Sequence, residues 1–278
     1  MIAAMPALPP EPKRDSRRPW LRRGMAGAAL IALSTLALTA QCRHEDLWLP
    51  GMTRDSLWKH VQQRCLIPER GRHADCAVVD RERGLVLYKD AIGPSHYLVI
   101  PDHRVTGVDD PKLWDDDKAQ NQWAFGWEAR DIVSQAVGPP VADNLVGLAV
   151  NSRASRSQDQ LHIHLDCISE AARAFVAENA AKASEGWGEF RFQGQPVRAV
   201  LIPSSDHTLR FNAFDAVRSS LREPARIADR GVFVSYVSRR DGPSGFMVVD
   251  QPVDGASGST GHASDFLDRA CRLGRTPQ

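Results

Sequence analysis

An uncharged apolar run near the N-terminus constrains this chain more than any other feature, because it separates a targeting segment from the rest. The run extends from Gly24 to Ala40, and six lysine or arginine residues precede it. At about 1.5 Å per residue, the run barely reaches across the roughly 30 Å hydrocarbon core of a bilayer. Its length therefore fits either a short retained anchor or the core of a cleaved signal peptide.

The basic flank of this run is expected to stay on the cytoplasmic side. We therefore divide the chain into a basic cytoplasmic N-terminus (1–23), a signal anchor or signal peptide (24–42) and an exported domain (43–278). The predicted location is the bacterial inner membrane, with a single-pass N-terminal anchor and the folded domain in the periplasm; cleavage would leave a periplasmic protein. Two alternatives stay open: the arginine pair in the flank resembles a twin-arginine signal, and Cys42 resembles the end of a lipoprotein box, although Gln41 departs from that motif.

Cysteine usage fits export to an oxidising compartment. Cys42 ends the apolar run, which leaves Cys65, Cys76, Cys167 and Cys271 in the predicted domain. An even number favours two disulfides, although four cysteines can pair in three ways and the sequence does not choose among them. Our hypothesis pairs Cys65 with Cys76 and Cys167 with Cys271. Four buried thiols are the alternative if the domain stays in the cytoplasm.

Apolar periodicity in the domain predicts an α+β fold with an antiparallel sheet, helices packed on one side, and a C-terminal portion that completes the same domain. Strands are predicted over 77–80, 85–88, 96–101, 145–150, 161–168, 198–202, 232–236 and 246–249. Helices are predicted near 55–64, over 122–137, from Ser169 as N-cap to Ala183, and over 264–272. Trp123 and Trp127 flank the apolar stripe of the second helix, which favours core packing.

The loop and strand 151–168 carry the residues best suited to chemistry. Alternation along the strand places His162, His164 and Asp166 on one face, and Cys167 with the apolar residues on the other. A neutral imidazole is nucleophilic near pH 7 and forms a labile phosphoramidate that water later cleaves. The pattern therefore favours phosphoryl or nucleotidyl transfer.

Charge in this region narrows the substrates and leaves one metal alternative. Arg153 and Arg156 in the loop can neutralise a bound phosphate. The formal net charge of +1 provides no broad basic field for nucleic acid, so no nucleic-acid partner is expected. A His-x-His pair can also bind zinc, but zinc needs further ligands and Cys167 points to the opposite face. An exported metal-binding protein therefore ranks second.

The strand resembles the signature of the histidine triad superfamily, in which histidines alternate with hydrophobic residues. Asp166 stands where the third histidine is expected. With this departure, the chain is similar to the CDP-diacylglycerol diphosphatase branch, also called CDP-diacylglycerol pyrophosphatase. The residues that carry this likeness are Asn151-Ser-Arg, His162-Ile-His164 with Cys167-Ile168, Lys89-Asp90 before Gly93-Pro94, Trp127-x-Ala-Arg-Asp131, the region of Cys65 and Cys76, and a late Cys271.

The resemblance implies a histidine-triad-like fold and hydrolysis of CDP-diacylglycerol to CMP and phosphatidate through a cytidylyl-histidine. It implies that His164 is the nucleophile and that His162 orients and polarises the phosphate site. The expected substrate-binding or phosphate-binding residues are Asn151, Arg153, Arg156, Gln158, Asp90, near the ribose, and His96. Membrane lipid is the expected partner besides the substrate, a homodimer is allowed, and no cofactor or metal is implied.

Alternatives from other classes stay open beside this expectation. The chain could be a nucleotidyltransferase that passes CMP to an acceptor other than water, or a hydrolase of another nucleotide diphosphate compound. A metal-binding protein would use His162 and His164 as ligands, and a non-catalytic envelope module would bind without turnover.

Overall fold

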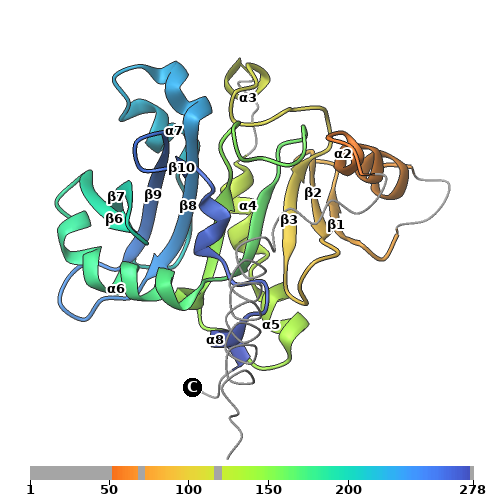
Figure 1. Cartoon of the computed structure of the whole chain (residues 1–278). Helices are drawn as coiled ribbons and strands as arrows, with labels where there is room; N and C mark the ends of the chain where they lie inside the picture. The colour runs from red at the N-terminus through yellow and green to blue at the C-terminus, as the bar shows by residue number, and fades with distance from the viewer. Residues whose placement is uncertain (1–51, 68–72, 116–120, 276–278) are drawn as a thin grey trace, which may run out of the picture. The chain divides into compact units, whose positions relative to one another are not determined.

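The computed structural model describes residues 52–67, 73–115 and 121–275, and the predicted targeting segment 1–42 lies outside them. The described residues form a mixed α+β domain around an antiparallel sheet of ten strands, in the order β1-β2-β3-β5-β4-β8-β9-β7-β6, with β10 paired to β9 (Figure 1). The predicted α+β class and antiparallel sheet are confirmed. Within the described residues, no helix is long and apolar enough to cross a membrane.

One half of the sheet consists of the first five strands, close to the ranges predicted from the sequence. It contains β1 (Cys76–Asp80), β2 (Leu85–Lys89), β3 (Tyr97–Pro101), β4 (Val146–Val150) and β5 (Ile163–Cys167). The other half contains β6 (Gly188–Phe192), β7 (Gln195–Pro203), β8 (Arg230–Val237), β9 (Gly245–Asp254) and β10 (Ser259–Thr260). Strand β5 pairs with both β3 and β4, so His164 lies on a strand with neighbours on both sides, and His162 directly precedes that strand.

The prediction that helices pack on one side of the sheet is wrong. One face is covered by α4 (Gln122–Glu128), α5 (Asp131–Val137) and α7 (Ala213–Ser219). The opposite face is covered by α6 (Glu170–Ala183) over one half, and by α2 (Ser56–His60) with the π-helical turn η1 (Val61–Cys65) over the other. Every residue of β4 and β5 is buried because both faces are covered.

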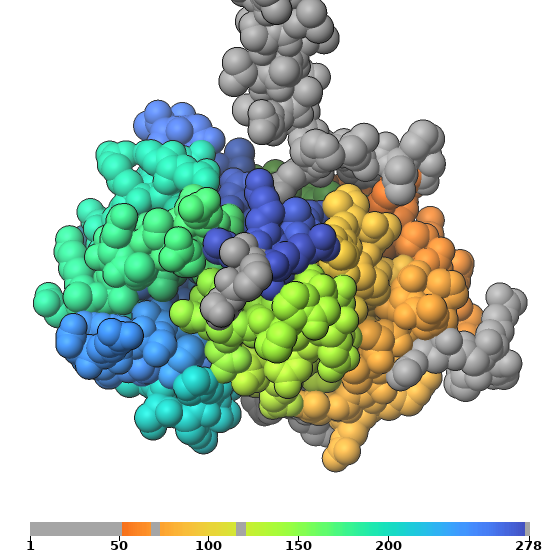
Figure 2. Space-filling view, turned by 90° about the horizontal axis from the view of Figure 1, so that it is seen from below, coloured from red at the N-terminus to blue at the C-terminus, as the bar shows by residue number. Residues whose placement is uncertain are grey.

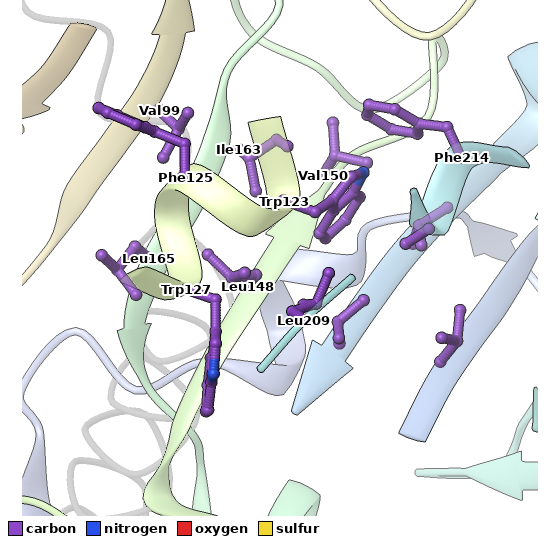
Figure 3. Packing of buried hydrophobic residues seen from close by; sticks show 14 of the residues in the cluster. Val99, Trp123, Phe125, Trp127, Leu148, Val150, Ile163, Leu165, Leu209 and Phe214 are labelled. Carbon is purple, nitrogen blue, oxygen red and sulfur yellow. The ribbon is translucent and has the colours of Figure 1, made fainter. Parts of the chain in front are cut away.

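The aromatic residues of α4 pack in the core, as predicted. Trp123 and Trp127 are 0% and 2% exposed, and Figure 3 shows them with Phe125 in the buried cluster that includes Val99, Leu148 and Val150. The predicted helix 122–137 is split at Ala129 and Arg130 into α4 and α5. Gly138, at φ 96°, ends α5.

The predicted closing helix over 264–272 is wrong. The chain instead forms a 3₁₀ turn η5 (Ala263–Phe266), a bridge residue followed by a turn over 267–271, and the short helix α8 (Arg272–Arg275). Leu267 bridges to Ile168, and the Asp268 amide donates to the Cys167 carbonyl at 2.8 Å. These bonds hold the segment alongside the end of β5, which a helix with its own internal hydrogen bonds would not allow. In Figure 2 the dark blue C-terminal segment lies between the green α6 side and the yellow β3 side.

Both hypothesised cysteine pairs are disulfides. Cys65–Cys76 joins η1 to β1, and Cys167–Cys271 joins β5 to the residue that precedes α8. All four cysteines are buried. The remaining short elements are α3 (Lys112–Asp115), η3 (Asp143–Leu145) and η4 (Pro224–Asp229).

Candidate active site

The histidines lie on one face of β5, between two apolar clusters. His164 is opposite Leu98 of β3 and Ala149 of β4. Leu98 belongs to the cluster under α2 and η1, whereas Ala149 belongs to the cluster under α6. The predicted alternation therefore places a polar site in the gap between two hydrophobic clusters, and the chemistry occurs in a largely water-excluded place.

The tautomer of His162 follows from its hydrogen bond. Its Nδ1 lies 2.7 Å from the carbonyl oxygen of Gln160. Because a carbonyl only accepts, Nδ1 carries the proton and Nε2 carries the lone pair. Burial lowers the pKa of His162, which keeps the ring neutral near pH 7. The geometry thus leaves His162 with an unprotonated nitrogen.

His164 belongs to a different arrangement, a chain of three side chains. Its Nδ1 lies 2.9 Å from His96 Nε2, and His96 Nδ1 lies 3.1 Å from a carboxylate oxygen of Asp90. The rings of His96 and His164 stack at 5.0 Å. Nε2 of His164 is fully buried and has no hydrogen-bond partner among the described residues. Nε2 of His162 does not meet both conditions.

Among the three contacting side chains, Asp90 carries a negative charge. Burial acts to raise the pKa of Asp90, but the hydrogen bond and charge of His96 outweigh it and hold the pKa at about 2. Burial, together with the charges of His162 and His96, holds the pKa of His164 well below its usual value. An ionised carboxylate therefore lies at one end of the chain and a neutral imidazole at the other.

Asp166 faces the histidine side of β5, as predicted, and makes a polar contact that the sequence did not reveal. Its Oδ1 accepts from Ser95 Oγ at 2.6 Å and from the Cys167 amide at 2.8 Å. Burial raises the pKa of this carboxyl. Ser95 is fully buried beside His96, so the turn before β3 contributes to the site as well as the strand.

Two residues predicted to bind phosphate hold neighbouring elements in place. The side chain of Asn151 donates to Ser264 Oγ at 3.1 Å and accepts from the Ser264 amide at 3.0 Å. Gln158 accepts from the Leu57 amide at 2.8 Å. Asn151 thus fixes η5 against β4, and Gln158 fixes the loop against α2.

The two predicted loop arginines have different surroundings. Arg156 pairs with both Asp109 and Asp159, and its side chain is only 11% exposed. Arg153 is exposed on the loop, where its backbone amide bonds to Ala228. Of the predicted binding residues, the structure therefore brings Asp90 and His96 to the histidines, while Arg156 is occupied by carboxylates.

The C-terminal segment brings two further basic side chains near the site. The positive charge of Arg269 contributes to lowering the pKa of His162, His164 and Asp90, and His262 contributes at His164. Neither residue was selected from the sequence, because each is distant from the His-x-His strand along the chain. The only sequence signal near Arg269 was Cys271, two residues further on.

The donor set gives little support to a metal centre. Among the described residues, no group of three or more His, Cys, Asp or Glu side chains is arranged to hold a metal ion. Cys167 is oxidised in a disulfide and so is not a thiolate ligand. His162 and His164 alone would leave a zinc ion short of the four ligands that it normally takes.

A cavity lies away from the histidines, at the β6–β7 edge. Its volume is about 440 Å³, and it is lined by Phe190, Arg191, Arg198 and Arg230 among others. None of the histidines lines it, so we identify the candidate site by its chemistry.

An unprotonated imidazole nitrogen beside a carboxylate–histidine chain is suited to the transfer of phosphoryl or nucleotidyl groups through histidine. A family comparison narrows this chemistry. The family model described as CDP-diacylglycerol pyrophosphatase matches residues 52–275, and the chain belongs to that family. Its activity is CDP-diacylglycerol pyrophosphatase activity, and CDP-diacylglycerol is the substrate that the family implies. The family predicted from the sequence is confirmed.

The neutral buried histidines predict a pH-dependent stability. In the unfolded chain His162 and His164 titrate near 6.5, but in the folded protein their pKa values are lower. Below about pH 6.5 the unfolded state therefore binds protons that the folded state does not, and the free energy of unfolding falls by up to about 1.4 kcal/mol per pH unit for each histidine. Above about pH 6.5 both histidines are neutral in the folded and unfolded states, so they no longer lower the free energy of unfolding.

Urea unfolding between pH 5 and 7.5 measures this slope. A double variant, His162→Gln with His164→Gln, should show a shallower fall in acid than the wild type. His103→Gln, at an exposed position, is the matched control and should keep the wild-type slope. Equal slopes in the wild type and the double variant would contradict the assignment of neutral buried rings.

Proposed function

We propose that the enzyme hydrolyses CDP-diacylglycerol to CMP and phosphatidate through a covalent cytidylyl-histidine on His162. The observation that carries this proposal is the hydrogen bond from Nδ1 to the Gln160 carbonyl, which leaves the Nε2 lone pair available. The resemblance seen in the sequence implied His164 as nucleophile. Nδ1 is engaged in both rings, in His162 with the Gln160 carbonyl and in His164 with His96. We assign the nucleophile to His162 because Nε2 of His164 is fully buried.

In the first step, Nε2 of His162 attacks the phosphorus that carries cytidine. A phosphorus–nitrogen bond forms, and the bond from that phosphorus to the bridging oxygen breaks. Phosphatidate leaves with the electron pair of the bridging oxygen. His164, whose ring lies edge-on to His162 at 4.9 Å, is placed to polarise the same phosphate.

In the second step, water attacks the cytidylyl phosphorus and the phosphorus–nitrogen bond breaks. The electron pair returns to Nε2 of His162, CMP is released, and the water molecule gives up a proton. We assign the acceptance of that proton to the chain of His164, His96 and Asp90, because its ionised carboxylate stabilises an added positive charge.

The finer architecture and the location belong to the same proposal. A histidine-triad-like arrangement is supported by the signature in β5 and by its place at the centre of the sheet. Export is supported by the two disulfides, which persist in oxidising compartments, and by the apolar run over 24–42. An anchor in the inner membrane would hold the periplasmic domain at the bilayer that contains its lipid substrate.

Rapid mixing with CDP-diacylglycerol, followed by acid-free quenching and mass spectrometry, tests the mechanism. We expect one CMP adduct on the peptide that contains His162, with and without EDTA. Turnover in heavy-oxygen water should place one heavy oxygen in CMP and none in phosphatidate. A wild-type enzyme that turns over without any adduct would overturn the covalent route, and loss of all activity in EDTA would favour the metal alternative.

A further inference from the structure

We infer that Arg269, brought to the site by the Cys167–Cys271 disulfide, is the side chain that binds and positions the substrate diphosphate. This inference rests on the proposed function, because it assumes that the diphosphate lies beside His162 and His164. Phosphate binding, which the sequence analysis assigned to Arg153 and Arg156, is here assigned to a residue of the C-terminal segment.

The path of the segment is the first argument. After η5 the chain runs beside the end of β5, with Leu267 bridged to Ile168. The Asp268 amide then donates to the Cys167 carbonyl, and the disulfide follows at Cys271. Arg269 lies between these attachments, so its backbone is fixed next to the strand that carries both histidines.

The packing against the turn before β3 is the second argument. A Cβ atom added at Gly93 would lie 2.6 Å from the carbonyl oxygen of Arg269 and 3.1 Å from its Cβ. Gly93 has φ +80°, a conformation that favours glycine. Arg269 therefore packs directly on the turn that leads from Asp90 to His96, and it lies between the two parts of the site.

The reach of its charge is the third argument. The positive charge of Arg269 acts to lower the pKa of four groups: Asp90, His162, His164 and Asp166. These four residues come from the turn before β3 and from β5 or the residue that precedes it. A cation that acts on all four lies close to the position that a bound diphosphate must occupy.

The remaining argument is the need for positive charge. A diphosphate diester carries about two negative charges at neutral pH, and a guanidinium matches such oxygens with paired donors. Arg269 supplies a guanidinium on a segment whose backbone lies against the turn before β3.

Equilibrium binding of CDP and steady-state kinetics test the inference in the full chain. Arg269→Ala should weaken CDP binding and raise KM about 10- to 100-fold, the range for losing hydrogen bonds to a charged group. Arg269→Lys should recover part of this loss, since it keeps the charge without the planar fork. Arg275→Ala, at an exposed position of α8, is the matched control and should bind CDP like the wild type.

Two further readouts separate this inference from the mechanism. Arg269→Ala should still form the CMP adduct on His162 at saturating substrate, and its thermal unfolding should show that it remains folded. Wild-type CDP affinity in Arg269→Ala would overturn the inference. If Arg153→Ala lost affinity for CDP and Arg269→Ala did not, the diphosphate would be bound by the loop that contains Arg153. Absence of any adduct in the wild type would instead refute the covalent mechanism and leave the binding result valid.

Discussion

His162→Ala should lose both the CMP adduct and turnover, with a fall in kcat of at least about 10³-fold, because the variant lacks the atom that forms the covalent bond. The fall should not depend on substrate concentration, since the loss is chemical and affects kcat. Single-turnover mixing with CDP-diacylglycerol measures it directly. CDP should still bind to the variant, because the diphosphate contacts are assigned elsewhere.

His164→Ala is the matched variant for this test. It removes a neighbouring imidazole on the same face of β5 but leaves the hydrogen bond between His162 and the Gln160 carbonyl in place. We expect slower formation and slower hydrolysis of the adduct, with the adduct still on His162. The reverse result, an adduct on His164 that survives His162→Ala, would show that the role implied by the sequence resemblance was correct.

Removal of the Cys167–Cys271 disulfide by a double Cys→Ser change should lower the free energy of unfolding by about 5 kcal/mol. The bond spans a sequence separation of 104 residues, and the chain-entropy account of disulfides assigns about 4.7 kcal/mol to a loop of that size. Because total stabilities of domains are commonly about 5–15 kcal/mol, such a loss would leave the protein close to unfolding. Urea unfolding without reductant measures the change.

The Cys65–Cys76 disulfide provides the control. Its separation is 11 residues, for which the same account gives about 3 kcal/mol. It joins η1 to β1, away from Arg269, so its removal should leave CDP affinity unchanged in protein that remains folded. Removal of Cys167–Cys271 should weaken CDP binding as Arg269→Ala does. If removal of either disulfide lowered the stability equally and left CDP affinity unchanged, the Cys167–Cys271 disulfide would have no role in positioning Arg269.

Local patterns were sufficient for much of the sheet and for the core of the site. Alternation in β5 placed His162, His164 and Asp166 on one face, because side chains in a strand alternate whatever surrounds it. The N-cap at Ser169 was predictable for a similar reason: its side chain bonds to the Ala172 amide three residues later. Strand β6 was missed because its residues are partly exposed at the sheet edge and lack an apolar run.

Other errors concern contacts that local patterns do not specify. The predicted helix 264–272 contains suitable residues, but pairing of Leu267 with Ile168 and the disulfide at Cys271 hold that segment against the end of β5 in a bridge and a turn. Helices were expected on one side because periodicity gives the apolar stripe of each helix without the face of the sheet that it covers. Arg156 looked available in the loop, and only the fold shows that Asp109 and Asp159 surround it.

The sequence by itself determined which residues share a face of β5, which cysteines are available to pair, and the family of the chain, since each depends on spacing or on residue identity. Only the tertiary structure decided that His164 contacts His96, which in turn contacts Asp90, because β3 and β5 are distant in sequence. It also decided that Arg269 belongs to the site. The chain between β5 and that residue closes a long loop, and spacing along a loop does not specify where its ends meet.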